Sequence, residues 1–451
     1  MERHFDLIVI GSGAGGSPVA FSCRAAGWNV AIIDSKPFGG TCALRGCDPK
    51  KVLVGAADVI DWTRRMQRKG VVAENAEIDW PLLMRFKRTF TDPVPESREQ
   101  GYKDAGITML HNRARFIDRT KLQVGEDILS GRFVHIAAGA RPATLGIDGE
   151  EHLTSSDQFL DLDDLPKRIS FVGGGYVSFE LAHVAARAGS HVQIIHRGAR
   201  PLEAFDPDLV DKLVEASREA GIEVSLNAAV KSIDQTAGRF VIKTLVNRLE
   251  GRIETDMVVH GAGRVPDIDD LDLDAANIKQ ERKGVSVNEY LQSVSNESIY
   301  ASGDAAAGGG LPLTPVASMQ AQIVATNILQ GNQLKPNYKG LPTVVFTIPP
   351  LASVGLQEEE AKKQGLKFKT NYADTSEWYS SKRINLKHSA FKVLVEEESD
   401  RILGAHLLGA YAEETINLFG LAIRNGLKVE ALRAMIYAYP THASDIAHML
   451  S

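Results

Sequence analysis

The stretch Phe5-Asp-Leu-Ile-Val-Ile10-Gly11-Ser-Gly13-Ala-Gly-Gly16 decides how the chain begins to fold. Its apolar run is typical of a buried parallel strand, and the glycines lead into a helical pattern that ends at Gly27. A second apolar run then ends at Asp34. Strand, glycine turn, helix, strand and acid in this order predict a dinucleotide site. Gly11, Gly13 and Gly16 let a pyrophosphate approach the helix N-terminus, and Asp34 can accept hydrogen bonds from a ribose.

The same pattern returns later in the chain. Arg168-Ile-Ser-Phe-Val172 is a predicted strand, the turn is Gly173-Gly-Gly175-Tyr176, and the next predicted strand ends at Ile195. This copy lacks the terminal acid and instead has Arg197 and Arg200 nearby. Arginine attracts a ribose 2′-phosphate, which an acid would repel. The first copy therefore suits FAD, and the second suits NADPH better than NADH. The alternative is that Arg197 and Arg200 are ordinary surface charges.

Two cysteines follow the first nucleotide signature in Gly39-Gly-Thr41-Cys42-Ala-Leu-Arg-Gly-Cys47-Asp-Pro49-Lys50-Lys51. Thiols at this spacing can close a small ring and reopen it, which makes them a candidate redox switch. Because Pro49 suits the first turn of a helix, we expect Cys47 at the positive end of that helix, where a thiol pKa falls. The alternative is that both cysteines are small packing residues.

Composition limits the other possibilities. The 451 residues suggest roughly three domains. With 44% hydrophobic residues, 24% charged residues and a net charge of −6, we expect a globular protein that binds neither nucleic acid nor membrane. Three cysteines do not make a disulfide framework, and the N-terminus lacks a secretory pattern, so we expect a cytoplasmic protein. Cys23, in a helical pattern, is expected to pack in the core.

Further motifs extend along almost the whole chain. They are Ala137-Ala-Gly139-Ala-Arg-Pro142, Thr154-Ser-Ser-Asp157, Gly173-Gly-Gly-Tyr176 with Glu180, Gly261-Ala-Gly263-Arg264-Val-Pro266, Ala301-Ser-Gly303-Asp304 and Leu313-Thr-Pro-Val-Ala317. With the cysteine segment, this ordered set resembles the class I pyridine nucleotide–disulfide oxidoreductases, the family of glutathione reductase, dihydrolipoamide dehydrogenase and mercuric reductase.

The resemblance implies an α/β fold with two Rossmann-like domains and a C-terminal α+β dimerisation domain. The FAD domain would comprise residues 1–145 and 265–335, the NAD(P) domain 146–264, and the dimerisation domain 336–451. A homodimer and a small-molecule oxidant are the implied partners, and no metal is implied. In the last segment, Phe391–Val395 and Ile402–Leu408 read as strands, and Glu413–Arg424 reads as a helix.

Roles for individual residues follow from the same resemblance. Cys47 corresponds to the thiolate beside the flavin, and Cys42 to the thiol that exchanges with substrate. Lys51 matches a lysine near the flavin N5, with Glu180 as its ion-pair partner. The other matched positions are Thr41, Gly139 and Asp304 at the FAD, and Gly173, Gly175, Tyr176 and Arg264 at the nicotinamide nucleotide. For Tyr176, core packing is the alternative.

The C-terminal segment departs from the family. Tyr439 stands where the disulfide reductases have a histidine that transfers protons, and Ser444 stands where they have a glutamate. Tyrosine, with an unperturbed pKa of about 10, is a poor base at neutral pH. His442 is three positions away, and we expect it to pack at a surface or interface. The arginines that anchor glutathione are also missing, since Phe21 and Gln322 occupy the best-aligned positions.

Three functions remain open. The leading hypothesis is an NAD(P)H- and FAD-dependent disulfide reductase that serves cell redox homeostasis. The second is a reductase of a non-disulfide acceptor, such as a metal ion, a quinone or oxygen, which Tyr439 favours. The third is a redox-sensing flavoprotein with little turnover, against which the intact cysteine pair and the Lys51–Glu180 match both argue.

Overall fold

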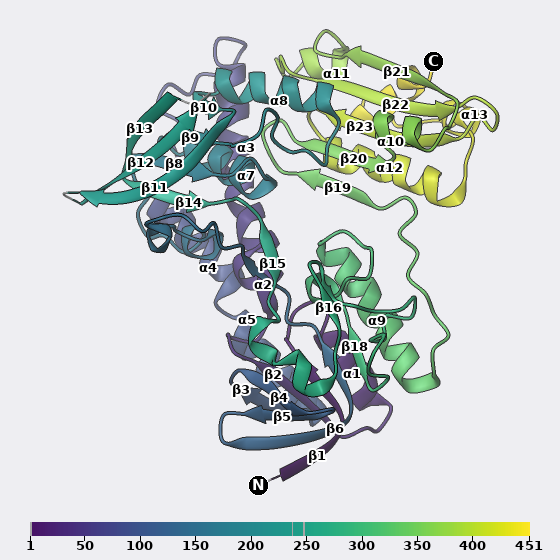
Figure 1. Ribbon diagram of the computed structural model, residues 1–451. Coiled ribbons are helices and arrows are strands. Elements are labelled where there is room, and N and C mark those ends of the chain that lie inside the picture. Colours follow the sequence, from purple (N-terminus) through teal and green to yellow (C-terminus); the bar gives the residue numbers. More distant parts are fainter. Residues whose placement is uncertain (1, 237, 247–248) are drawn as a thin grey trace. The chain divides into compact units, whose positions relative to one another are not determined.

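The computed structural model describes residues 2–236, 238–246 and 249–451. These residues form two compact units, each assembled from separate stretches of the chain (Figure 1). Unit 1 comprises Met1–Lys50, Arg85–Ala143 and Gly263–Asn337, and unit 2 comprises Lys51–Met84, Thr144–Ala262 and Tyr338–Ser451. Each unit is described by itself below.

Unit 1 is built on a seven-stranded sheet of order β3-β2-β1-β6-β5-β4, in which β18 also pairs with β6. The pairs among β3, β2, β1, β6 and β18 are parallel, and β5 runs antiparallel to β6 and β4. The strands are β1 (Glu2–Ile10), β2 (Val30–Asp34), β3 (Thr108–His111), β4 (Ala114–Asp118), β5 (Lys121–Val124), β6 (Asp127–Ile136) and β18 (Ile299–Ala301). Two short antiparallel pairs complete the unit: β7 (Ala140–Pro142) with β15 (Arg264–Pro266), and β16 (Gln280–Glu281) with β17 (Gly284–Val285).

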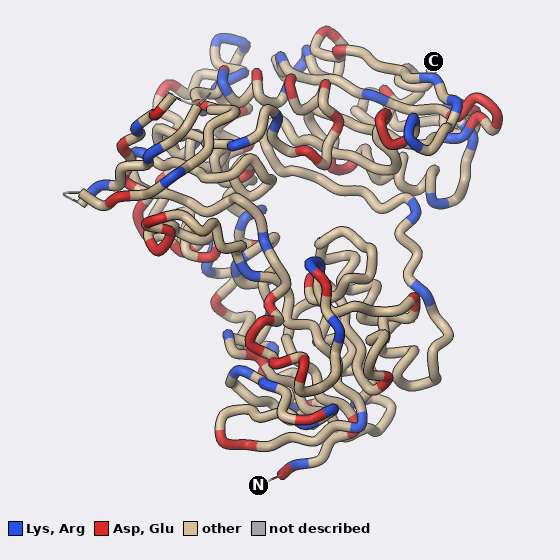
Figure 2. The backbone as a smooth tube through the Cα atoms, in the orientation of Figure 1, with Lys and Arg blue, Asp and Glu red and all other residues tan. Residues whose placement is uncertain are grey.

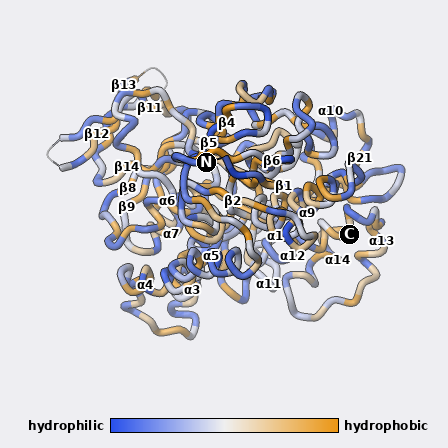
Figure 3. Tube along the Cα trace, turned by 90° about the horizontal axis from the view of Figure 1, so that it is seen from below, coloured by the Kyte–Doolittle hydropathy of each residue, from blue (hydrophilic) through white to orange (hydrophobic). Residues whose placement is uncertain are grey.

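The predicted first strand is buried on both faces from Leu7 to Ile10, which explains its continuous apolar run. Figure 3 colours the chain by hydropathy and shows hydrophobic and hydrophilic stretches interspersed along it. Ile8 and Ile10 belong to one hydrophobic cluster of the sheet, whereas Leu7 and Val9 belong to another. The second cluster includes residues of α1 (Ser17–Ala25) and α9 (Thr314–Gln330), among them Cys23. Cys23 is fully buried and burial raises its pKa to about 12, so the predicted packing role is confirmed.

The other helices of the N-terminal half are α2 (Gly40–Arg45), α3 (Cys47–Met66), α4 (Trp80–Thr91) and α5 (Val94–Ala105).

Unit 2 contains the second predicted dinucleotide motif. A parallel sheet of order β10-β9-β8-β14 is made of β8 (Arg168–Val172), β9 (His191–Ile195), β10 (Ile222–Ser225) and β14 (Met257–His260). An antiparallel sheet adds β11 (Ala228–Thr236), β12 (Arg239–Val246) and β13 (Leu249–Thr255). The helices here are α6 (Ser156–Phe159), α7 (Tyr176–Arg187) and α8 (Pro207–Glu219).

The C-terminal segment adds a five-stranded antiparallel sheet of order β19-β20-β23-β22-β21. Its strands are β19 (Pro342–Val345), β20 (Leu351–Gly355), β21 (Phe368–Asp374), β22 (Ala390–Glu396) and β23 (Ile402–Leu408). Its helices are α10 (Glu358–Lys363), α11 (Tyr379–Lys382), α12 (Ala412–Asn425), α13 (Val429–Arg433) and α14 (Ile446–Met449). The two strands and the helix predicted from the sequence, now β22, β23 and α12, are confirmed.

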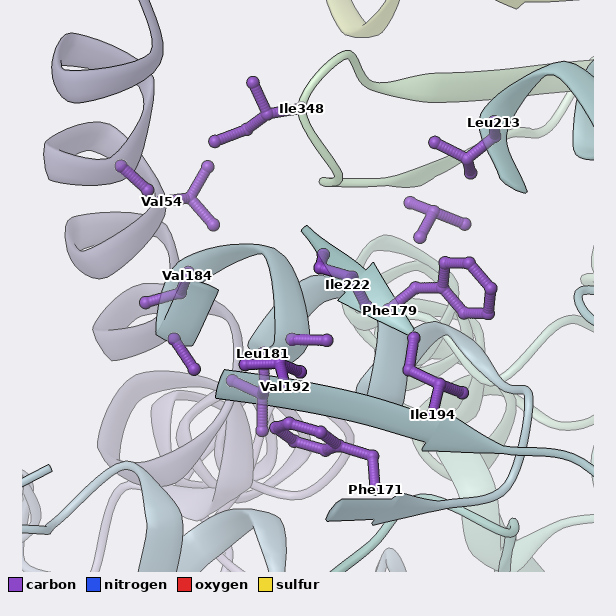
Figure 4. Close-up of a cluster of buried hydrophobic side chains, with 14 of the residues drawn as sticks. Val54, Phe171, Phe179, Leu181, Val184, Val192, Ile194, Leu213, Ile222 and Ile348 are labelled. Carbon is purple, nitrogen blue, oxygen red and sulfur yellow. The ribbon is translucent and has the colours of Figure 1, made fainter. Parts of the chain in front are cut away.

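One hydrophobic core joins the two parts of unit 2. Phe171 and Phe179 belong to the same buried cluster as Val54 of α3 and Ile348 of the C-terminal segment (Figure 4). The predicted NAD(P) domain and the predicted dimerisation domain share this core, and both therefore fall in unit 2. Our three-domain division and its boundaries remain a prediction.

Charged residues of both signs are interspersed along the chain in each unit (Figure 2). In the described part of the chain, no helix is both long and apolar enough to cross a membrane.

Candidate active site

The first glycine turn of unit 1 has the geometry that a pyrophosphate site requires. Gly11 has a φ of +101°, and a Cβ there would lie 2.2 Å from the carbonyl oxygen of Ala137. A Cβ on Gly16 would lie 1.9 Å from the carbonyl oxygen of Gly11. Only glycine fits at either position, and helix α1 begins immediately afterwards at Ser17. The turn therefore presents helix N-terminal N–H groups to a phosphate, and these residues fit FAD.

Asp34 lies at the end of β2, as predicted, and it also holds the turn in place. Its Oδ2 accepts hydrogen bonds from the backbone N–H of Ser12 at 2.9 Å and from the Ser12 hydroxyl at 2.6 Å. Sequence reasoning missed Ser12, because a serine between two glycines has no distinctive spacing. A carboxylate has about four acceptor positions, so Asp34 retains capacity for a ribose.

Asp304 lies just beyond β18, in a short 3-10 helix (Gly303–Ala305). Burial raises the pKa of its carboxyl, and the positive charge of Arg264 opposes that shift. Arg264, which was predicted to line the nicotinamide pocket, lies in unit 1 with Asp304 and donates a hydrogen bond to the carbonyl oxygen of Ala140. Of the other predicted FAD residues, Gly139 has a φ of +76° and Thr41 is exposed on α2.

The cysteine pair lies across a helix break. Cys42 belongs to α2, and α3 begins at Cys47, as the Pro49 argument predicted. The hydrogen bond from Cys42 lowers the pKa of Cys47 to about 6, helped by the Thr314 hydroxyl and the charge of Lys50 and opposed by burial. The same hydrogen bond, with burial, raises the pKa of Cys42. Both thiols are free in this structure, and Cys47 is the more acidic of the two.

Two further residues contact the pair. The hydroxyl of Thr314 lies 3.5 Å from the Sγ of Cys47, and a carboxylate oxygen of Asp48 lies 4.0 Å from the Sγ of Cys42. The negative charge of Asp48 also raises the pKa of Cys42. Thr314 belongs to the motif Leu313–Ala317, but the sequence predicted no role for it, because 267 residues separate it from Cys47.

Lys51 and Glu180, the predicted ion pair, both lie in unit 2, and each of them contacts Phe346. The ammonium of Lys51 lies 4.3 Å from the centre of the Phe346 ring, and the backbone N–H of Phe346 donates to Glu180 Oε1 at 2.9 Å. Glu413 of α12 adds an unpredicted carboxylate, with Oε1 at 4.0 Å from the Lys51 Nζ. Burial raises the pKa of the nearby Asp58 to about 6, which the charge of Lys51 opposes.

The second glycine turn repeats the geometry of the first. Gly173 has a φ of +113°, and a Cβ there would lie 2.4 Å from the carbonyl oxygen of Gly261. Helix α7 begins at Tyr176, whose side chain is 44% exposed, so a role in core packing alone is excluded. Arg197 and Arg200 are exposed after β9, and neither forms an ion pair with the described residues. Both are therefore available to an anionic ligand.

The C-terminal segment places Tyr439 at a cavity of about 490 Å³, with its side chain 82% exposed. His442 instead turns inward against the ring of Tyr411, with centroids 5.1 Å apart. Burial, reinforced by the charge of Arg383, lowers the pKa of His442 to about 4. His442 is therefore a neutral packing residue near pH 7.

Among the described residues, no group of three or more histidine, cysteine or acidic side chains could hold a metal ion.

Comparison with known proteins agrees with this geometry. Residues 5–321 match the family described as pyridine nucleotide-disulphide oxidoreductase, and residues 341–450 match the dimerisation domain of that family. A mercuric reductase of Lysinibacillus sphaericus is 30% identical over 99% of this chain and 82% of its own. An uncharacterised 19.7 kDa protein in a mercuric resistance operon of Staphylococcus aureus is 53% identical over its whole length and 40% of this chain.

Among solved structures, a Cu(II) complex of the HOCl-induced flavoprotein disulfide reductase RclA from Escherichia coli superposes with a TM-score of 0.88. The two chains are 26% identical, and the match covers 99% of each. The family depends on FAD and NAD(P)H. The sequence, the two nucleotide turns, the paired thiols and these matches show that the chain belongs to the class I pyridine nucleotide-disulfide oxidoreductases.

Proposed function

We propose that the protein is an NADPH-dependent reductase in which Cys42 and Cys47 pass electrons to a small disulfide. Bound FAD would supply the link between the nicotinamide and the Cys42–Cys47 bond. The observation that supports this proposal most directly is the hydroxyl of Thr314 at 3.5 Å from the Sγ of Cys47, a contact that favours the thiolate of Cys47. A thiolate at Cys47 and a thiol at Cys42 are the two forms that a reduced, exchange-competent pair needs.

The exchange itself can be written for this chain's own residues. Cys42, once deprotonated, attacks one sulfur of the acceptor, forms a mixed disulfide and releases one thiolate. The Cys47 thiolate then attacks the Sγ of Cys42, closes the Cys42–Cys47 bond and releases the second thiolate. Two protons complete the two product thiols, and Tyr439 stands where a histidine would handle them in the family.

The preference for NADPH rests on Arg197 and Arg200. Both are exposed at the end of β9, where a 2′-phosphate would lie if the nucleotide binds at the second glycine turn. The first copy keeps an acid, Asp34, at the matching position, which suits FAD.

A second candidate acceptor is a thiophilic metal ion. Tyr439 favours it, because transfer of electrons to a metal ion releases no thiolate that a histidine must protonate. Two of the matched proteins point the same way by their names, one as a mercuric reductase and one as a Cu(II) complex. Two thiols with an exposed approach are also suitable ligands for a soft metal ion.

Reduction of the purified protein tests the common part of both candidates. NADPH should yield a two-electron reduced state with a long-wavelength thiolate–flavin absorption band. Cys47→Ser should abolish this band, and Cys42→Ser should show it without any reductant. The opposite pattern would mean that the roles of the two cysteines are exchanged. Steady-state NADPH oxidation with disulfides, Hg(II), Cu(II), quinones and oxygen then identifies the acceptor.

A further inference from the structure

The C-terminal part of unit 2 contains the cavity of about 490 Å³ beside Tyr439, a size typical of small-molecule sites. One wall is made by Trp378, Tyr379 and Arg383, at and around α11. The opposite wall comes from the last residues of the chain, including Tyr439 and Asp445. The two walls are about sixty residues apart in sequence, so the linear pattern gave no indication of this cavity.

The first wall contains the positively charged side chain of Arg383. Arg383 is exposed, and its guanidinium forms no ion pair with the described residues. Its charge nevertheless reaches the opposite wall: burial raises the pKa of the Asp445 carboxyl, and the charge of Arg383 is one of the contacts that oppose this shift. A planar guanidinium facing an open cavity is suited to bidentate contact with a carboxylate.

The second wall offers a partner for the opposite charge. Asp445 is partly buried, and it accepts a hydrogen bond from the hydroxyl of the buried Ser380. That contact occupies one of its carboxylate oxygens and leaves acceptor capacity on the other. Trp378, whose indole packs edge-to-face with the ring of His448 at 6.0 Å, adds an aromatic surface on which an ammonium group is favoured.

We propose that this cavity binds the α-amino-acid end of a small disulfide, with the carboxylate on Arg383 and the ammonium on Asp445. Arg383 is then a specificity residue for the acceptor. The assignment of this ligand as an electron acceptor rests on the proposed function, whereas the binding of the amino-acid end does not. Tyr439 lines the same cavity, which places the zwitterion next to the residue that departs from the family pattern.

S-methylcysteine tests the binding step, because it carries the zwitterionic end but has no disulfide to reduce. Isothermal titration of the FAD-loaded full-length protein should show binding. Arg383→Gln should weaken it by about 10- to 100-fold, the range expected for one charged hydrogen-bonded contact. The matched control is Lys382→Gln, because Lys382 pairs with Glu377 and does not line the cavity. Absence of binding to the wild type, or equal affinity of wild type and Arg383→Gln, would overturn the proposal.

Four disulfides then test the carboxylate contact and the ammonium contact separately. Cystine carries both charges, cystamine only the ammonium, 3,3′-dithiodipropionate only the carboxylate, and 2-hydroxyethyl disulfide neither. We expect KM to be lowest for cystine, and Arg383→Gln should remove its advantage over cystamine. Asp445→Asn should remove its advantage over dithiodipropionate. If S-methylcysteine binds as expected but none of the four is reduced, the disulfide acceptor is wrong and the cavity assignment stands. A wild type that does not discriminate among the four would overturn the specificity role.

Discussion

The hydroxyl of Thr314 lies 3.5 Å from the Sγ of Cys47, although the two residues belong to different helices and are 267 positions apart. The contact lowers the pKa of Cys47, because a hydroxyl that donates to sulfur favours the thiolate. Thr314 is the first residue of α9, so the fold fixes its backbone independently of the cysteine segment.

Replacement of Thr314 by valine should therefore raise the pKa of Cys47. A net hydrogen bond contributes about 1 kcal/mol, which corresponds to about 0.7 pKa unit. The pH dependence of alkylation by iodoacetamide, measured in the Cys42→Ser background, gives this pKa directly. Thr314→Ser keeps the hydroxyl and should behave like the parent. An unchanged alkylation midpoint in Thr314→Val would show that the hydroxyl does not act on Cys47.

The protein should purify yellow with one FAD per chain, and Gly11→Ala should lose most of this FAD. The added methyl group would lie 2.2 Å from the carbonyl oxygen of Ala137, in a backbone conformation that alanine rarely adopts. Absorbance at 450 nm relative to protein concentration measures the loss, with circular dichroism to confirm folding. Gly55→Ala, in a helix with open space around its Cα, is the control and should retain FAD. A folded wild type that cannot be loaded with FAD would refute the FAD site.

NADPH should be the better reductant, and Arg197→Glu should reverse the preference. The substitution places an acid next to the expected 2′-phosphate, so kcat/KM for NADPH should fall by about tenfold or more while NADH is less affected. Arg282→Glu makes the same change of charge at an exposed position of unit 1 and should alter neither value. A wild-type preference for NADH would contradict the assignment of Arg197 and Arg200.

Asp58 should make thermal stability fall as the pH rises from about 4 to about 6. Burial raises its pKa to about 6 from an ordinary value of 3.8, so the folded state holds a proton that the unfolded chain has already released. The stability from this protonation is complete below pH 3.8 and is lost above pH 6. Asp58→Asn removes the charged form, so its gain in melting temperature should be larger at pH 8 than at pH 5.

The control for Asp58 is Asp211→Asn, at an exposed position on α8. Its effect on the melting temperature should be small and should not depend on pH. A gain for Asp58→Asn that is the same at pH 5 and pH 8 would show that the carboxyl titrates normally.

Sequence alone predicted the parts of the molecule that depend on local pattern. Glycine turns at Gly11 and Gly173 are readable because only glycine fits there, and the strand before each has a continuous apolar run. Contacts between distant segments were missed for a physical reason: the positions of Thr314 beside Cys47 and Glu413 beside Lys51 are set by tertiary packing. Neither residue type is distinctive at its position. The cavity at Arg383 was missed for the same reason.

Tyr439 should make glutathione disulfide a poor substrate. We expect NADPH to reduce the enzyme quickly and the reduced enzyme to turn over glutathione disulfide slowly. Tyrosine cannot exchange protons with the leaving thiolate near pH 7, and His442, with its pKa lowered to about 4 and its ring packed on Tyr411, cannot do so in its place. If the resemblance aligns Phe21 and Gln322 with the arginines that anchor glutathione, those anchors are absent as well. The reduction of the Cys42–Cys47 bond by NADPH needs no such base, so stopped-flow reduction should be fast while steady-state turnover is slow.

Tyr439→His should restore the missing proton transfer and raise kcat with glutathione disulfide. A general base typically contributes about 10²- to 10⁴-fold, so even a poorly placed histidine should give a measurable gain. The gain should also depend on pH, because the imidazole must first take the proton of Cys42 before it passes a proton to the leaving thiolate, so the gain should fall below the histidine pKa of about 6.5. Tyr439→Phe is the matched control, which keeps the ring and removes the hydroxyl. Efficient wild-type turnover that is unchanged in Tyr439→Phe would show that another group transfers the proton and that the C-terminal motif has been misinterpreted.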